Sequence, residues 1–107
     1  MRKIAMLIFI LSFSVIVFSA LTGIAKEGYF FTRTKEQMEK IIEHSAKNDE
    51  DFLETYTEEL IIAGDGGMLK AGSEVYIIET DSDLVKFRVK GETDSFWTLK
   101  RAIIIKK

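Results

Sequence analysis

Residues 85–103, VKFRVKGETDSFWTLKRAI, decide how the second half of the chain folds. Val85, Phe87 and Val89 alternate with basic residues, and this alternation predicts a strand with one apolar and one basic face. Residues 91–95 combine a glycine with polar residues and predict a turn. Residues 96–99 predict the next strand, so we expect a β-hairpin that carries the only tryptophan of the chain.

The role of Trp97 has two interpretations. An exposed indole would stack on a ligand such as a sugar of the cell wall. A buried indole would fill a small core and donate its N–H to one acceptor. Phe96 and Trp97 are adjacent, so they face opposite sides of the strand. We interpret Trp97 as mainly structural, and we expect the rest of that core to come from Val75, Ile77, Val85, Phe87 and Val89.

Further strands are expected on both sides of this hairpin. Residues 74–79 are apolar at both parities in their centre, which is typical of a strand buried on both faces. A short strand is expected at residues 68–69, and residues 102–105 predict the strand that closes the domain.

Two helices are expected before these strands. Thr34 and Gln37 have the spacing of a capping box, and Asn48 or Asp49 is placed to cap a second helix that Gly64 ends. Two short helices joined by a tight break predict an antiparallel hairpin, which needs tertiary packing to persist. Their apolar stripes are formed by Met38, Ile41, Ile42 and Ser45 in the first helix, and by Phe52, Leu53, Tyr56, Leu60 and Ile61 in the second.

The N-terminus has the pattern of an export signal. Arg2 and Lys3 precede a run from residue 4 to residue 25 that contains no charge. A secretory signal has a basic start, an apolar core and small residues before the cut. Gly23 and Ala25 supply such small residues, so residues 1–25 are expected to be a signal peptide that is cleaved before Lys26.

The same run has an alternative interpretation as an uncleaved membrane anchor. About 20 apolar residues suffice to span a bilayer. Tyr29, Phe30 and Phe31 would then form an interfacial aromatic belt. Under either interpretation the rest of the chain is exported. It is expected to be periplasmic or secreted, or else anchored to the cytoplasmic membrane and facing outward, with membrane contact only through residues 4–25.

Three segments carry a resemblance to a known family: KAGSEVYII at 70–78, LVKFRVKG at 84–91 and FWTLKRAI at 96–103. They resemble the bacterial Src homology 3-like barrels of exported proteins. The chain is also similar to small exported bacterial proteins of unknown function with an acidic helical segment before such strands. The resemblance implies a small antiparallel β-barrel over residues 67–107. Proline-rich peptide binding is not implied, because this sequence has one Trp and no acidic-aromatic first loop.

Together these patterns predict an α+β fold within one domain. Residues 1–25 form the signal or anchor helix, residues 26–66 form a helical hairpin, and residues 67–107 form the small Src homology 3-like barrel on which the hairpin packs. Residues 26–107 are expected to fold as one unit. The chain has no Cys, which excludes disulfides, thiolate metal sites and a thiol nucleophile.

Catalytic and metal-binding patterns are weak in this sequence. His44 is the only histidine, and no motif supplies the nucleophile and orienting partner that a general base requires. Glu54 and Glu58 are interpreted as part of a solvated helix face. Asp81 and Asp83 are interpreted as turn residues, because a calcium site needs about six or more oxygen ligands. We therefore expect no enzyme activity, no metal and no cofactor.

Charge is distributed unevenly along the chain. Residues 43–65 contain eight acidic residues and one lysine, whereas residues 84–107 contain seven basic and two acidic residues. Such a bipolar domain can steer charged partners, although the two halves can also simply attract each other or stay solvated. Nucleic acid is not an expected partner, because of the export signal and the net charge of −2.

The expected function is therefore that of a non-catalytic exported module that binds a cell-envelope component, such as a cell-wall polymer, or a protein partner. The alternative is a small inhibitor or accessory subunit of an exported enzyme. Lys86, Arg88 and Lys90 lie at alternate positions of one predicted strand, and they are the candidate contact face for anionic groups. The competing interpretation is a solvated basic face that keeps a sheet edge from aggregating.

Overall fold

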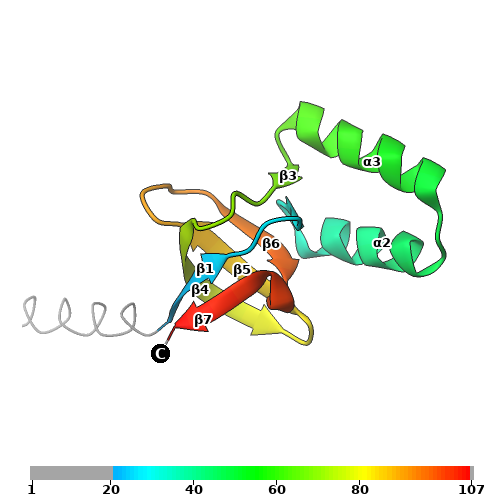
Figure 1. The fold of residues 1–107 in the computed structure, drawn as a ribbon. Coiled ribbons are helices and arrows are strands. Elements are labelled where there is room, and N and C mark those ends of the chain that lie inside the picture. The colour runs from blue at the N-terminus through cyan, green and yellow to red at the C-terminus, as the bar shows by residue number, and fades with distance from the viewer. Residues whose placement is uncertain (1–20, 107) are drawn as a thin grey trace, which may run out of the picture.

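The computed structural model describes residues 21–106 (Figure 1). Residues 1–20, most of the predicted signal or anchor segment, lie outside the described residues. The strands are β1 (Thr22–Ala25), β2 (Phe30–Thr32), β3 (Gly66–Met68), β4 (Glu74–Asp81), β5 (Leu84–Val89), β6 (Ser95–Leu99) and β7 (Ile103–Lys106). The helices are α2 (Lys35–Ala46) and α3 (Glu50–Ala63), with the short 3-10 helix η1 (Lys100–Ala102) before β7. Within residues 21–106, neither α-helix combines the length and the apolar character needed to cross a membrane.

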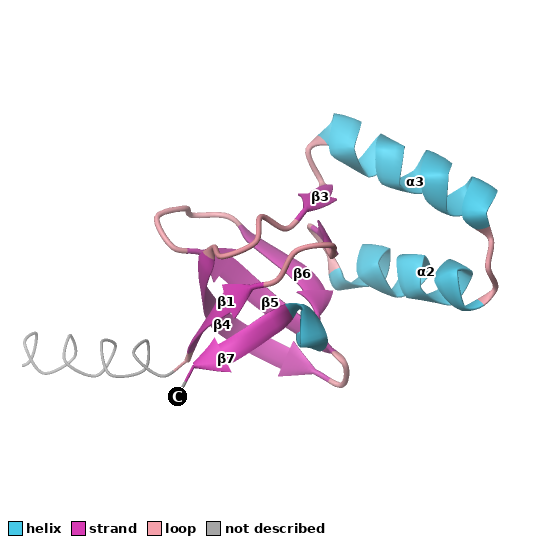
Figure 2. Ribbon diagram, viewed as in Figure 1, coloured by secondary structure: helices cyan, strands magenta, loops and turns pink. Residues whose placement is uncertain are grey.

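All strand pairs are antiparallel, in the order β3-β2-β6-β5-β4-β1-β7. The predicted α+β class is therefore confirmed. Figure 2 shows β1, β4, β5, β6 and β7 wrapping around one another away from the helices, with β3 next to the helical hairpin. The terminal strands β3 and β7 do not pair with each other, so the sheet is not a closed barrel.

Two strands precede the helices, and the sequence patterns did not predict them. β1 lies between β4 and β7, with Thr22 opposite both Tyr76 and Lys106. A Cβ atom on Gly23 would lie 2.5 Å from a side-chain carbon of Ile103, so β1 packs closely against β7. A cut before Lys26 would remove this whole strand from the sheet.

Two of the three aromatic residues after β1, Tyr29 and Phe31, pack against the core cluster. β2 pairs with both β3 and β6. The ring of Phe31 lies 4.7 Å from the ring of Phe96 and 6.2 Å from that of Phe87, measured between centroids. The expected belt at residues 29–31 is therefore corrected for Tyr29 and Phe31, which belong to the folded sheet. The alternating pattern of β2 was too short to recognise beside a long apolar run.

The helix ends agree with the predicted capping residues. The Thr34 side chain accepts a hydrogen bond from the Gln37 backbone, and the Gln37 side chain accepts one from the Thr34 backbone. Asp49 caps α3 by accepting from the backbone N–H of Phe52 at 3.3 Å. Gly64 ends α3 in the left-handed conformation, with a φ of 80°.

The β5–β6 hairpin buries apolar residues on both of its faces. On one face, which we call the core face, lie Val85, Phe87 and the half-buried Phe96. On the other, the helix face, Trp97 is buried with Leu84 and with Met38 of α2. The prediction that Trp97 is a buried side chain is confirmed. The predicted partners are wrong, because Val75, Ile77, Val85, Phe87 and Val89 belong to the core face with Phe96.

The two helices differ in their relation to the sheet. α2 packs on the helix face through Met38 and contacts β2 and β6, whereas the main contacts of α3 are with α2 and β3. Figure 1 shows the hairpin projecting from the sheet with α3 farther away. The predicted packing of a hairpin on the sheet is therefore made by its first helix.

Candidate functional site

The predicted contact residues lie on or next to the helix face. Lys86 is in the middle of β5, with Glu79 of β4 on one side and Trp97 of β6 on the other. Arg88 is two residues farther along β5, and Lys90 follows the end of the strand. Lys86 and Arg88 therefore lie on one side of β5, as the alternation predicted, whereas Lys90 lies beyond the strand.

Arg88 and Lys90 are occupied by contacts within the chain. The Arg88 guanidinium lies 4.9 Å from the ring centroid of Tyr76 and donates to the carbonyl of Glu92 at 2.8 Å. The Lys90 ammonium lies 3.2 Å from a carboxylate oxygen of Glu74, and this hydrogen bond raises the pKa of Lys90. The structure therefore does not bring the three predicted residues together as one free basic face.

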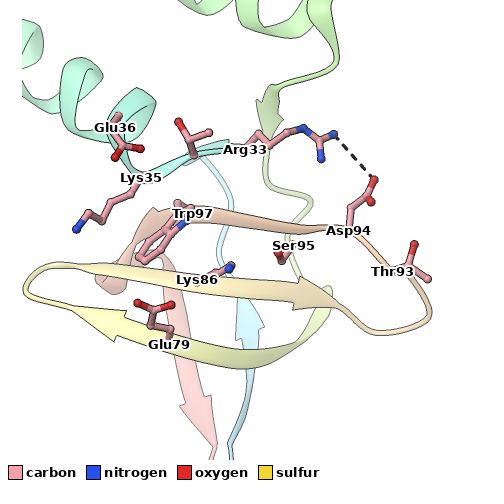
Figure 3. Close-up of a pocket in the computed structure, with 10 residues that line it drawn as sticks. Arg33, Lys35, Glu36, Glu79, Lys86, Thr93, Asp94, Ser95 and Trp97 are labelled. Carbon is pink, nitrogen blue, oxygen red and sulfur yellow. Dashed lines mark ion pairs between the residues drawn. The ribbon is translucent and has the colours of Figure 1, made fainter.

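Lys86 instead borders an open cleft of about 580 Å³ between the start of α2 and the helix face (Figure 3). The cleft is lined by charged groups of both signs, by hydroxyl groups and by an edge of Trp97. The charged residues are the bases Arg33, Lys35 and Lys86 and the acids Glu36, Glu79 and Asp94. We call this the charged cleft.

Backbone and hydroxyl hydrogen bonds hold the α2 side of the charged cleft in place. The buried Thr32 hydroxyl donates to the carbonyl of Thr34 at 2.8 Å, and the backbone N–H of Arg33 donates to the carbonyl of Asp65 at 2.7 Å. The Arg33 side chain lies 3.2 Å from the Asp65 carboxylate and 3.9 Å from that of Asp94. Its guanidinium also lies 5.1 Å from the ring centroid of Phe96. These contacts hold the Arg33 side chain in place at the edge of the charged cleft.

The two lysines of the charged cleft differ in their availability. Lys35 forms an ion pair with Asp81 at the end of β4, and this hydrogen bond raises the pKa of Lys35. Lys86 forms no ion pair with any residue in the described part of the chain, although Glu79 lies beside it on the sheet. Lys86 is therefore the cation of the charged cleft that is available to a ligand.

The exposed side of α3 forms a second surface. α3 contains five acidic residues and no lysine or arginine, and none of its acids forms an ion pair within residues 21–106. Near its C-terminal end, Ile61 and Ile62 are 52% and 82% exposed. α3 thus presents isolated apolar side chains next to unpaired negative charge, and we call it the acidic helix.

His44 joins the two helices. Its Nδ1 atom lies 3.1 Å from a carboxylate oxygen of Asp49, and its ring stacks on Phe52 with centroids 3.7 Å apart. Both partners belong to the start of α3, so the contact fixes the turn between α2 and α3.

Asp81 and Asp83 lie at the β4–β5 turn, as expected. In the part of the chain that the structure describes, no three His, Cys, Asp or Glu side chains are grouped to hold a metal ion.

Sequence reasoning found Lys86 but missed the opposite wall of the charged cleft. Arg33, Glu36 and Asp94 come from a loop, a helix start and another loop that are distant in sequence. No short motif links them, because their proximity depends on β2 pairing with β6 and on α2 following β2 directly.

Comparisons of the chain with protein-family models, with curated proteins and with solved structures gave no match.

Proposed function

We propose that this protein is a non-catalytic binding module of the bacterial cell envelope, with a Src homology 3-like arrangement of its strands. Its ligand site is the charged cleft. The observation that carries this proposal is Lys86, an available cation in a cleft that also contains three carboxylates and the edge of a tryptophan. The export-type N-terminus supports the location.

The mixture of charges favours a ligand that carries both carboxylate and amino groups. A polyanion would meet the three carboxylates of Glu36, Glu79 and Asp94, and like charges brought together in an interface disfavour binding. A peptide-like ligand can present an amino group to these acids and a carboxylate to Lys86. The peptide stems of the cell wall have this chemistry, so they are the envelope component that we propose as ligand.

Retention on purified, insoluble peptidoglycan tests this function. Lys86→Glu reverses the charge at the centre of the cleft, and Lys70→Glu makes the same change at an exposed residue outside it. We expect the Lys86 variant to lose retention while the Lys70 variant behaves as the original protein, and thermal denaturation checks that both variants are folded at the temperature of the assay. Binding of the original protein should also weaken as salt rises, because the contacts are charged and solvated.

Two outcomes contradict the proposal. If the original protein is not retained on peptidoglycan, the cell-wall ligand is wrong. If Lys86→Glu and Lys70→Glu reduce retention equally, binding depends on overall charge and not on the charged cleft.

The acidic helix supports a second candidate function, that of a small inhibitor or accessory subunit of an exported enzyme. Interfaces commonly combine apolar anchors with a charged rim, and α3 offers Ile61 and Ile62 beside unpaired carboxylates. An enzyme partner of this kind would need a basic rim around an apolar pocket. Under this alternative, Ile62→Asp abolishes association with the partner, whereas Lys86→Glu leaves it unchanged.

A further inference from the structure

A row of three side chains crosses the helix face at the charged cleft. Glu79 of β4 is directly opposite Lys86 of β5, and Lys86 is directly opposite Trp97 of β6. Side chains at opposite positions of antiparallel strands share a face, with Cβ atoms about 4.5–5.5 Å apart. All three line the cleft, and Figure 3 shows them one beside the next. The row therefore presents an anionic, a cationic and an apolar group in a fixed order.

An irregularity in β4 places the carboxylate in this row. The register of β4 on β5 shifts between Ile77 and Glu79, and Ile78 has no partner in the pairing. Without the extra residue Ile78 would be opposite Lys86, and Glu79 would point toward the core face. Bulges are frequent next to functional sites, where they re-aim a side chain. The bulge at Ile78 thus brings the Glu79 carboxylate to the Lys86 side of the sheet.

The two charges of this row differ from the charges around them. Neither Glu79 nor Lys86 forms an ion pair within residues 21–106. The other cations of the cleft are engaged, because Lys35 pairs with Asp81 and Arg33 lies within ion-pair distance of two carboxylates. The row therefore offers one carboxylate and one ammonium from neighbouring strands, and its net charge is zero.

This arrangement is complementary to a ligand that carries an ammonium and a carboxylate on one carbon atom. The ligand ammonium can donate to the Glu79 carboxylate while the Lys86 ammonium donates to the ligand carboxylate. Charge-assisted hydrogen bonds of this kind are stronger than neutral ones, and a complementary order of charges contributes mainly to specificity. An alkyl chain on the same carbon can lie along the edge of Trp97.

We propose that the row of Glu79, Lys86 and Trp97 recognises the free zwitterionic end of a diamino-dicarboxylic acid in cell-wall peptide stems that are not cross-linked. Stems built on diaminopimelic acid have this end, with a short alkyl chain behind it. Stems built on lysine have only an ammonium there, and cross-linking acylates that ammonium. The inference rests on the proposed function, because it names the part of the peptide stem that the charged cleft binds.

The test compares two soluble stem tripeptides, alanyl-γ-glutamyl-diaminopimelate and alanyl-γ-glutamyl-lysine. They differ by a single carboxylate at the end of the last side chain. Isothermal titration calorimetry on the full chain in detergent gives their dissociation constants. We expect the diaminopimelate tripeptide to bind several-fold more tightly, because only this ligand offers a carboxylate to Lys86 beside the ammonium.

Two variants assign the ligand groups to the two charges of the row. Lys86→Gln should remove the difference between the tripeptides without weakening the binding of the lysine tripeptide. Glu79→Gln should weaken both tripeptides by a similar factor, because both carry the ammonium. The matched controls Lys70→Gln and Glu54→Gln remove the same charges at exposed residues outside the charged cleft, and both should bind the tripeptides like the original protein.

Free alanine tests the source of the ligand, since it carries the same zwitterionic groups without the rest of the stem. We expect it to displace the diaminopimelate tripeptide only at much higher concentration. Displacement by alanine at equal concentration would mean that the row binds free amino acids, and it would overturn the assignment to the peptide stem.

Equal binding of the two tripeptides to the original protein, or binding of neither, would overturn this inference. Glu79 and Lys86 would then be a cross-strand pair that contributes only to the stability of the sheet. The proposed function would stand if the protein were still retained on peptidoglycan through Lys86. Absence of that retention would instead contradict the proposed function itself, so the two failures are distinguishable.

Discussion

The core face and the helix face of the β5–β6 hairpin are built from adjacent residues, yet they depend on different parts of the chain. The core face is completed by other strands, which contribute Val75 and Ile103 around Phe87. The helix face is completed by α2, whose Met38 packs on Leu84 and Trp97. The comparison teaches that alternation along a strand predicts which residues share a face, but not what covers each face.

The largest expected effect belongs to the core face. Phe87 is fully buried at the centre of this cluster, and Phe87→Ala should lower the free energy of unfolding by about 3–5 kcal/mol, through lost burial and the cavity left behind. Urea denaturation measures it. Ile62→Ala, at a side chain that is 82% exposed, is the control, and its effect should stay within about 0.5 kcal/mol. Equal effects would mean that the core face is not the main core.

A substitution on the helix face should lower the free energy of unfolding less than Phe87→Ala does, because α2 can shift to fill the space left behind. Met38→Ala should destabilise the protein at the lower end of the range of about 2–5 kcal/mol for such changes. Trp97 is the only tryptophan, so its fluorescence reports on this face alone. The emission should shift to longer wavelength as water reaches the indole.

Met68→Ala provides the matched control for the helix face, because Met68 is exposed. It should leave both the stability and the tryptophan emission unchanged. A Met38→Ala protein whose emission maximum does not move would contradict the burial of Trp97 under α2.

The same comparison explains how much the sequence could reveal. The hairpin, the helix caps at Thr34 and Asp49 and the start of β4 at Glu74 follow from local chemistry, and they were predicted, whereas β4 continues to Asp81, beyond its predicted end at residue 79. β1 was hidden because Thr22–Ala25 continues an apolar run whose first part has the pattern of an export signal. Only its pairing with β4 and β7 distinguishes it, and pairing between distant segments leaves no local signature.

The charged cleft was predicted only in part for a related reason. Lys86 was found because alternation placed it on a basic face, and Trp97 was known to lie on the neighbouring strand. Arg88 contacts the ring of Tyr76, and Lys90 pairs with Glu74. Both contacts depend on the register of β4 against β5, which shifts between Ile77 and Glu79. That register could not be read from the sequence.

A third prediction extends the core face to β1. Gly23→Ala would place a Cβ atom 2.5 Å from Ile103 Cγ2 and 2.9 Å from the carbonyl oxygen of Ile104. The side-chain atom can move, but the backbone oxygen belongs to the sheet, so the free energy of unfolding should fall by about 1–3 kcal/mol. Thermal or urea denaturation of the full chain in detergent measures it. Unchanged stability would indicate that β1 is not held between β4 and β7.

The smallest expected effect concerns the ion pair that joins α2 to the end of β4 on the helix face. The hydrogen bond with Asp81 raises the pKa of Lys35 above the ordinary 10.5 of a lysine. A raised pKa in the folded state means that the contribution of this pair is fully present below the ordinary lysine value. It is lost as the pH rises through the raised pKa of Lys35.

Lys35→Gln removes the contribution at every pH, so the melting temperature of the variant should fall slightly less between pH 9 and pH 11.5 than that of the original protein. The comparison with Lys70→Gln, at an exposed lysine with no ion pair within residues 21–106, isolates the pair. Because both groups of the pair are solvated, the effect should be small and should fade in high salt. Parallel curves for Lys35→Gln and the original protein would mean that the pair does not hold α2 on the helix face, and that the Met38 contact does so alone.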